Sequence, residues 1–195
     1  MKNIAIFASG SGTNAENLIR TFAQTDIFVT RVYCNNPKAK VLERAQNLNV
    51  PVTVFSKEDF YESSMIYDLL RKEQVEFIVL AGFMLFIPSN ILSAFDNKIL
   101  NIHPSLLPKY GGKGMFGIHV HEAVIANKEE KSGITIHLVN EFFDSGEIVF
   151  QKECPVLPND TPEVRAQRVH QLEYEYYPQV VRNILGKSSL TVTFM

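Results

Sequence analysis

Residues 4–15 read IAIFASGSGTNA and join a short apolar run to a glycine-rich turn. The run Ile4–Ala8 is apolar throughout and ends shortly before glycine, which predicts a buried β-strand. Gly10–Asn14 predicts a turn, and Ala15–Phe22 repeats its apolar residues at the spacing of one helical face. The chain therefore opens with a strand, a turn and a helix, which is how a unit of an α/β sheet begins.

Strand and helix patterns alternate through the rest of the first half. Strands are predicted at residues 28–34, 52–55, 77–81 and 98–103, and helices at residues 38–48 and 57–72. Ser56 is suited to cap the second of these helices, and Pro88 could open a further one. Such alternation implies right-handed crossovers and a parallel sheet with helices on both faces.

The second half changes to an antiparallel pattern. Residues 133–139 alternate, with Ile134, Ile136 and Leu138 on one side of a predicted strand. Residues 147–156 form a second strand candidate, so the two could pair as a hairpin or meander. We therefore predict an α/β fold: a doubly wound, mostly parallel Rossmann-like sheet with an antiparallel extension in the C-terminal half. One domain over residues 1–195 suits the length.

A long helix is predicted near the C-terminal end. Thr161 is a suitable cap, and Pro162 is favourable at the first helical position. The apolar pattern continues to Leu185, and Pro178 should kink the helix.

The composition fits a soluble globular protein. The 195 residues are 46% hydrophobic and 21% charged, and the formal net charge is −2. This balance gives no long-range attraction for polyanions, so we expect no nucleic-acid partner. Cys34 and Cys154 lack metal-ligand spacing and favour a reducing compartment over a disulfide scaffold. With no signal-peptide pattern and no apolar run long enough for a bilayer, we expect a cytoplasmic protein without a membrane partner.

The glycine turn is the first candidate binding site. Backbone N–H groups at the start of a helix suit an anion, most often a phosphate. Gly10–Ala15 also matches the dinucleotide pattern G-x-G-x-x-A, which requires an acidic residue about 20 positions later. Cys34–Asn36 ends the second strand without a carboxylate, so a mononucleotide or a sugar phosphate is favoured over NAD. The alternative is a tight turn that binds nothing.

Asn101 and His103 form the second candidate site, at the end of the strand predicted for residues 98–103. Two residues apart in a strand, they project to the same side, at the edge where open α/β sheets bind ligands. Asn101 could hold a developing oxyanion while His103 gives or takes a proton, which suits acyl transfer. The alternative is a buried core histidine beside an asparagine that terminates the strand.

Asp144 is the third candidate, although a carboxylate before Ser-Gly is by default a turn residue. A carboxylate close to His103 would favour the imidazolium and raise the pKa of the ring. His103 would then be a better acid at neutral pH.

The remaining histidines have weaker functional support. His119 and His121 stand two apart beside Glu122, but nothing supplies a further ligand, so we expect no metal. His137 lies on a predicted strand and could point to either face. We expect His170 on the surface of the last helix.

Three ordered blocks resemble a known family. Residues 101–108, NIHPSLLP, resemble the signature of the formyltetrahydrofolate-dependent transferases. Residues 80–84, LAGFM, resemble the strand and turn that line the folate pocket of that family, and residues 144–146, DSG, resemble its Asp-x-Gly loop. The resemblance extends over nearly the whole chain and implies an enzyme that uses 10-formyltetrahydrofolate as co-substrate.

Further motifs resemble the branch of the family that formylates glycinamide ribonucleotide in purine synthesis. They are residues 12–14 (GTN), 109–110 (KY), 119–123 (HVHEA) and Glu173 ahead of residues 177–178 (YP). The branch that acts on methionyl-tRNA has an added C-terminal domain, and the hydrolase branch has an N-terminal regulatory domain, so both fit this length less well. Another amine acceptor, such as an amino sugar on a nucleotide, and a binding module without catalysis remain alternatives. We expect a monomer or a weak homodimer.

The resemblance implies a role for each matched position. Those that would hold the substrate phosphate are Gly12, Thr13 and Asn14, while Glu173 would contact the glycinamide part. Those that would meet the folate are Met84, Leu85, Phe86 and Ile87, together with Lys57 and Asn101. The catalytic group would be Asn101, His103 and Asp144. Residues 1–103 would then form the nucleotide-phosphate-binding half, and residues 104–195 the folate and catalytic-loop half.

The chain departs from the family pattern at three places. Leu85 stands where an arginine is frequent, and Lys57 occupies the place where an arginine often meets the folate. A lysine is a point charge, so recognition of the glutamate tail could change. The segment 109–117, KYGGKGMFG, is longer than usual; it could cover the phosphate as a lid or be a tolerated insertion.

Overall fold

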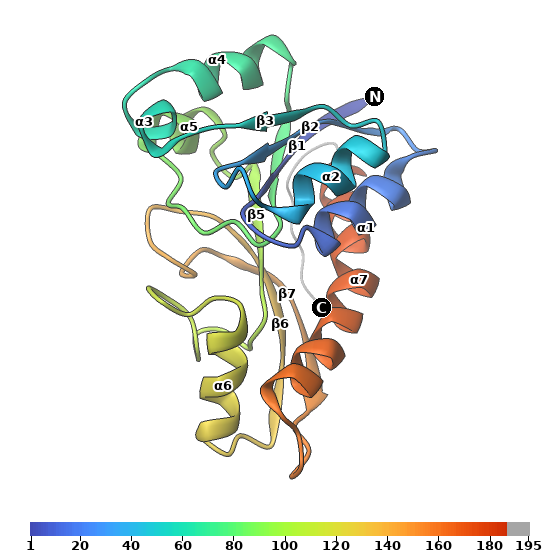
Figure 1. The fold of residues 1–195 in the computed structure, drawn as a ribbon, viewed down its shortest axis with the longest axis vertical. Coiled ribbons are helices and arrows are strands. Elements are labelled where there is room, and N and C mark those ends of the chain that lie inside the picture. The colour runs from blue at the N-terminus through green and yellow to red at the C-terminus, as the bar shows by residue number, and fades with distance from the viewer. Residues whose placement is uncertain (187–195) are drawn as a thin grey trace.

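Seven strands form one sheet in the order β3-β2-β1-β4-β5-β6-β7 (Figure 1). The computed structural model describes residues 1–186. The strands are β1 (Lys2–Ala8), β2 (Ile27–Cys34), β3 (Val52–Val54), β4 (Phe77–Leu80), β5 (Ile99–His103), β6 (Lys131–Leu138) and β7 (Ile148–Pro155). All pairs from β3 to β5 are parallel, whereas β6 is antiparallel to both β5 and β7. The predicted fold class is confirmed.

Helices cover both faces of the sheet (Figure 1). They are α1 (Thr13–Phe22), α2 (Lys40–Asn47), α3 (Lys57–Tyr61), α4 (Met65–Lys72), α5 (Ser89–Ala94), α6 (Ile118–Ala126) and α7 (Pro162–Gly186). Residues of β1 alternate between two cores: Ile4 and Ile6 pack with α1, α2 and α7, while Ala5 and Phe7 pack with α3, α4 and α5. A strand that is buried on both sides needs the continuous apolar run that the sequence has here.

The helix predicted at residues 57–72 was wrong, because the chain forms two helices there. Ser56 caps α3 as predicted, with its hydroxyl accepting from the Asp59 N–H. The Ser63 hydroxyl then donates to the Asp59 carbonyl and accepts from the Met65 N–H. Serine hydroxyls compete with the helical backbone for hydrogen bonds in this way, so they end one helix and allow the next to begin.

Helix α6 was absent from the sequence-based expectation. Its residues, IHVHEAVIA, are apolar around most of the helix and show no clear single face, so periodicity gives no signal. Helix α7 is continuous through Pro178, so the kink expected there remains a prediction. None of the helices within residues 1–186 is both long and apolar enough to cross a bilayer.

The strand order places a topological switch at β1. Its two neighbours, β2 and β4, lead the chain to opposite sides of the sheet. In open α/β sheets, ligands bind outside the carboxyl ends of the strands at such a point. The glycine turn follows β1 directly, and His103 ends β5 two strands away, so both face this edge.

Candidate active site

A cleft of about 560 Å³ opens beyond the carboxyl ends of β1, β4 and β5. Segments that are far apart in the sequence meet there. Of the predicted site residues, the cleft brings together Gly12, Thr13, Asn14, Met84, Asn101, His103, Asp144 and Glu173. This gathering at the switch point makes the cleft the candidate active site.

Asn101 lies opposite His137 in the antiparallel pair β5–β6. Its amide nitrogen is 3.1 Å from His137 Nε2 and 3.4 Å from Asp144 Oδ1. Nδ1 of His137 is 2.8 Å from the Leu138 carbonyl, which can only accept, so in the neutral ring Nδ1 carries the proton and Nε2 accepts. One N–H of Asn101 is therefore held by His137. The contact to Asp144 is longer, so the second N–H of the amide is only weakly bound and can donate to a substrate oxygen instead.

His103 is buried at the end of β5, with an acceptor beside each ring nitrogen. Nε2 is 2.7 Å from the Tyr110 carbonyl oxygen, and Nδ1 is 3.6 Å from Asp144 Oδ2. The neutral ring thus carries its proton on Nε2 and keeps the Nδ1 lone pair toward Asp144. Burial lowers the pKa of His103, and the Asp144 carboxylate offsets this only in part. Asp144 thus acts on the pKa in the predicted direction, but the net change is a decrease because desolvation of the imidazolium outweighs the attraction of one carboxylate.

Asp144 lies in the loop between β6 and β7 and reaches back to the end of β5. Its Oδ2 accepts from the Gly112 N–H at 2.9 Å. Burial alone would raise the pKa of Asp144, but the contacts with His137, His103 and Gly112 together lower it. The carboxylate is therefore ionised at neutral pH and faces both histidines.

The glycine turn and α7 meet at the other side of the cleft. Gly12 has φ of 75° and precedes the first turn of α1. The Asn14 amide donates to Glu173 Oε2 at 2.8 Å, and His170 Nδ1 lies 2.8 Å from the same oxygen. The hydrogen bond to Glu173 raises the pKa of His170. Within residues 1–186 the other carboxylate oxygen, Oε1, has no hydrogen-bond partner, so it can accept from a ligand.

Two further histidines lie in or next to the cleft. His137 is buried and turned toward Asn101, and the signal that could have found it is the β5–β6 register. His170 was expected on the surface; it is half-buried and lines the cleft. Its position three residues before Glu173 on α7 was the available cue, since such residues share a helix face.

Arg165 is a buried cation that the sequence did not predict. Its side chain on α7 is fully buried, and the guanidinium donates to the Pro104 carbonyl at 3.1 Å and to His121 Nδ1 and the Ser132 hydroxyl. Burial, with Arg165 close by, lowers the pKa of His121 to about 3, so that ring is neutral. Groups of three or more metal-ligating side chains are not found among residues 1–186.

Replacing Arg165 with alanine is expected to lower the free energy of unfolding by about 2–5 kcal/mol, because the change leaves a cavity and buried acceptors without a donor. Chemical denaturation measures the loss. Arg182→Ala, at an exposed position of α7, is the matched control and should change the free energy by less than about 0.5 kcal/mol. Equal effects of the two substitutions would contradict the structural role of Arg165.

Four predicted folate-binding residues lie outside the lining of the cleft: Lys57, Leu85, Phe86 and Ile87. Lys57 is exposed at the start of α3, and Ile87 is buried among α3, α4 and α5. The Phe86 carbonyl already accepts from the Tyr61 hydroxyl at 3.0 Å. At Met84, which does line the cleft, the backbone N–H donates to the Ser9 hydroxyl at 3.0 Å. Of residues 84–87, Met84 alone therefore lines the cleft.

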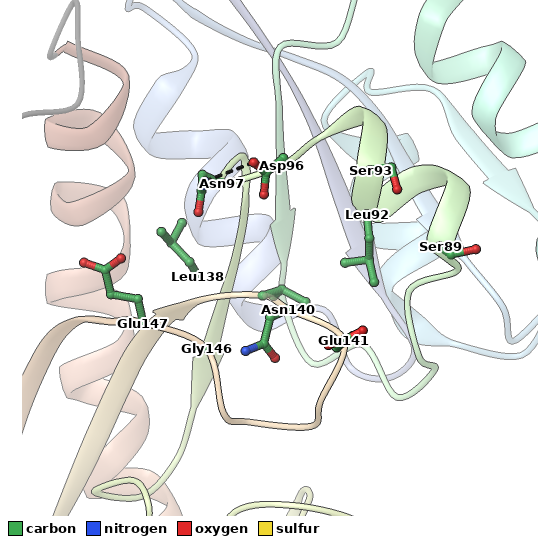
Figure 2. A pocket seen from close by; sticks show the side chains of 11 residues that line it. Ser89, Leu92, Ser93, Asp96, Asn97, Leu138, Asn140, Glu141, Gly146 and Glu147 are labelled. Atoms are coloured by element: carbon green, nitrogen blue, oxygen red, sulfur yellow. Dashed lines mark hydrogen bonds between the residues drawn. The ribbon is translucent and has the colours of Figure 1, made fainter.

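A second hollow, of about 630 Å³, lies between α5 and residues 138–147 (Figure 2). Its lining includes the carboxylates of Asp96, Glu141 and Glu147 and no lysine, arginine or histidine. It shares no residue with the cleft, and its charge would repel a phosphate. The hollow therefore does not suit a phosphate.

The sequence matches a known protein family. A family model described as formyl transferase matches residues 2–181. The chain belongs to the formyl transferase family.

Similar members of the formyl transferase family are known from sequence and structure. The chain is 40% identical over 187 residues to the chloroplastic phosphoribosylglycinamide formyltransferase of Arabidopsis thaliana, covering 92% of this chain and 64% of that protein. It is 37% identical to the phosphoribosylglycinamide formyltransferase of Bacillus subtilis, covering 95% and 96% respectively. The crystal structure of glycinamide ribonucleotide transformylase 1 from Geobacillus kaustophilus has a TM-score of 0.86 and 40% identity, over 95% of this chain and all of that one. The chain thus spans less than two thirds of the plant relative.

The cleft of this formyl transferase contains polar groups whose chemistry is compatible with acyl transfer. Asn101 can donate to an oxygen that gains negative charge, and the Nδ1 lone pair of His103 can accept a proton. Asp144 is placed to stabilise the imidazolium that results. The glycine turn and Glu173 offer donors and an acceptor at a distance from this centre.

Proposed function

We propose that this chain transfers the formyl group of 10-formyltetrahydrofolate to the amine of glycinamide ribonucleotide in de novo purine synthesis. The observation that carries the proposal is one cleft that holds Asn101, His103 and Asp144 together with the Gly12–Asn14 turn and Glu173. The similarity to phosphoribosylglycinamide formyltransferases that match nearly their full length supports the same reaction.

The acceptor end of the cleft suits a sugar phosphate. Backbone N–H groups at the start of α1, a helix of 10 residues, can bind the phosphate, and the Thr13 hydroxyl can add a donor. The Oε1 atom of Glu173 can accept a hydrogen bond from an N–H of the glycinamide part or an O–H of the ribose of the acceptor. Asn14 and His170 hold the Glu173 carboxylate in place through Oε2.

The donor end of the cleft has a wall that fits a pterin. Met84, Met115, Phe116 and Phe143 line the cleft, and three of them, Met84, Phe116 and Phe143, are exposed. Phe83 also lines it, but its ring packs on Phe7 and Phe60 in the core. A flat aromatic ring system packs well on aromatic and thioether side chains. We therefore place the folate against these side chains and leave Lys57 outside the site.

The reaction joins the acceptor nitrogen to the formyl carbon and breaks the bond from that carbon to the folate nitrogen, which takes up a proton. Asn101 donates to the formyl oxygen as negative charge develops there. His103, neutral before the reaction, accepts the amine proton at Nδ1 and then donates it toward the leaving nitrogen. Asp144 stabilises the imidazolium during this exchange.

This order of proton transfers predicts the dependence of kcat/KM on pH. Because burial places the pKa of His103 below 6.5, the neutral ring persists under mildly acidic conditions. After division by the fraction of acceptor amine that is unprotonated, we expect kcat/KM to hold its neutral-pH value down to below pH 6.5 and to fall as His103 takes up a proton. In Asp144→Asn this acidic limb should move to lower pH, since the carboxylate favours the imidazolium. An acidic limb that starts above pH 7 would contradict a neutral His103.

The decisive assay follows deformylation of 10-formyltetrahydrofolate spectrophotometrically with and without glycinamide ribonucleotide. Release of deformylated folate only when the ribonucleotide is present is the expected result. Release without any acceptor would indicate a hydrolase, and no release with folate bound would indicate another acceptor or a binding module.

We also propose a single domain in which both halves form the site. Residues 1–103 supply the glycine turn and Met84, and residues 104–195 supply Asp144 and Glu173. Cys34 and Cys154 are both free thiols, which is compatible with a protein of the reducing cytoplasm.

A further inference from the structure

The cleft poses a charge problem for a phosphorylated acceptor. A phosphate monoester carries a charge of about −1.5 to −2 at neutral pH. The carboxylates of Asp144 and Glu173 also line the cleft. A phosphate bound at the glycine turn is therefore stabilised by a cation that is not already paired with a carboxylate.

Most basic groups near the turn have such a partner or are neutral. His170 is bound to Glu173, and His121 is a neutral ring behind which Arg165 is buried. Arg44 donates to the Ser11 carbonyl at 2.9 Å, but its guanidinium also forms an ion pair with Glu16. None of these groups offers an unpaired charge to the phosphate, and Lys40, whose neighbour Val41 bonds to the turn, lies outside the lining of the cleft.

Lys113 lies in the lining of the cleft. It is the one lysine or arginine in the lining formed by residues 1–186, and no described carboxylate pairs with it. It stands between Gly112 and Gly114, both with positive φ (91° and 89°), and the Gly112 N–H is anchored on Asp144 at 2.9 Å. The backbone of this loop, anchored on Asp144, therefore holds Lys113 in the lining of the cleft.

We propose that Lys113 is a specificity-determining residue that binds the phosphate of the acceptor. The segment 109–117, longer than the family pattern, would then supply the positive charge opposite the α1 N-terminus. This inference rests on the proposed function, since it requires a phosphorylated acceptor. The alternative anion is a glutamyl carboxylate of the folate donor, which the test separates.

The test compares wild type with Lys113→Met, which removes the charge and keeps the length, and with Lys113→Arg, which keeps the charge. A charge-assisted hydrogen bond at a partly exposed site corresponds to about a 10-fold change in affinity. We expect Lys113→Met to raise KM for glycinamide ribonucleotide about 10-fold, with kcat and the folate KM within about 2-fold. Lys113→Arg should stay within about 3-fold of wild type. Lys109→Met, whose ammonium pairs with Glu129 outside the cleft, is the control and should not change these constants.

An acceptor without phosphate, glycinamide riboside, completes a thermodynamic cycle. If Lys113 binds the phosphate, Lys113→Met should lower kcat/KM for the ribonucleotide about 10-fold and leave the riboside nearly unaffected. Inorganic phosphate should also inhibit wild type more strongly than Lys113→Met. Equal losses with both acceptors, or a rise in the folate KM alone, would overturn the inference. If wild type itself shows no deformylation that depends on the ribonucleotide, the proposed function fails instead.

Discussion

Replacing Asp144 with asparagine is expected to lower kcat by about 10²- to 10⁴-fold, the usual contribution of general acid–base catalysis. The substitution keeps the size of the side chain and the acceptor for the Gly112 N–H. It removes the charge that faces His103 at 3.6 Å and would stabilise the imidazolium during proton transfer. The loss should therefore appear in kcat, measured in the same spectrophotometric assay, and KM for either substrate should change little.

Glu141→Gln is the matched control for this substitution. Glu141 is an exposed carboxylate in the same β6–β7 loop, and it lies outside the cleft. Removing its charge should leave kcat within about 2-fold, since surface substitutions away from a site have small effects. Thermal unfolding should show that both variants fold as wild type does. A kcat for Asp144→Asn close to that of Glu141→Gln would show that Asp144 has no catalytic role.

The fold could be predicted from the sequence wherever the local pattern of apolar residues determines the secondary structure. The apolar run Ile4–Ala8 became part of a strand buried on both faces, as such runs do in parallel sheets. Prediction was wrong where the sequence pattern is ambiguous. Helix α6 has no distinct apolar face, and the break between α3 and α4 depends on the Ser63 hydroxyl, which competes with the backbone.

The candidate site was predictable to the extent that neighbouring residues share a strand. Asn101 and His103 are two apart on β5, so their common direction follows from strand geometry alone. His137 joins them only through the register of β5 against β6, which a single sequence does not specify. The net pKa direction of His103 likewise depends on burial, a property of the whole fold. The same holds for Arg165, a charged helix residue that would ordinarily be placed on the surface.

Replacing Gly12 with alanine should have the largest effect on both folding and acceptor binding. A Cβ atom there would lie 2.4 Å from the Cβ and Cγ2 atoms of Val41 and 2.6 Å from its Cα. Val41 is fully buried on α2, so it cannot move aside without displacing the helix. The positive φ of 75° adds a further penalty for a side chain. Together these effects should lower the free energy of unfolding by about 2–5 kcal/mol.

Gly10→Ala separates this steric effect from a general loss of glycine. A Cβ at Gly10 would meet no atom within 4 Å, so we expect its free energy of unfolding to change by less than about 1 kcal/mol. Differential scanning calorimetry should place Gly12→Ala about 5–15 °C below wild type, given about 2–4 °C per kcal/mol at this chain length. Because α1 must shift away from α2, its first N–H groups should leave the phosphate, and KM for the ribonucleotide should rise more than 10-fold. Equal stability of the two variants would show that the close approach of α1 to α2 at Gly12 does not hold the turn in place.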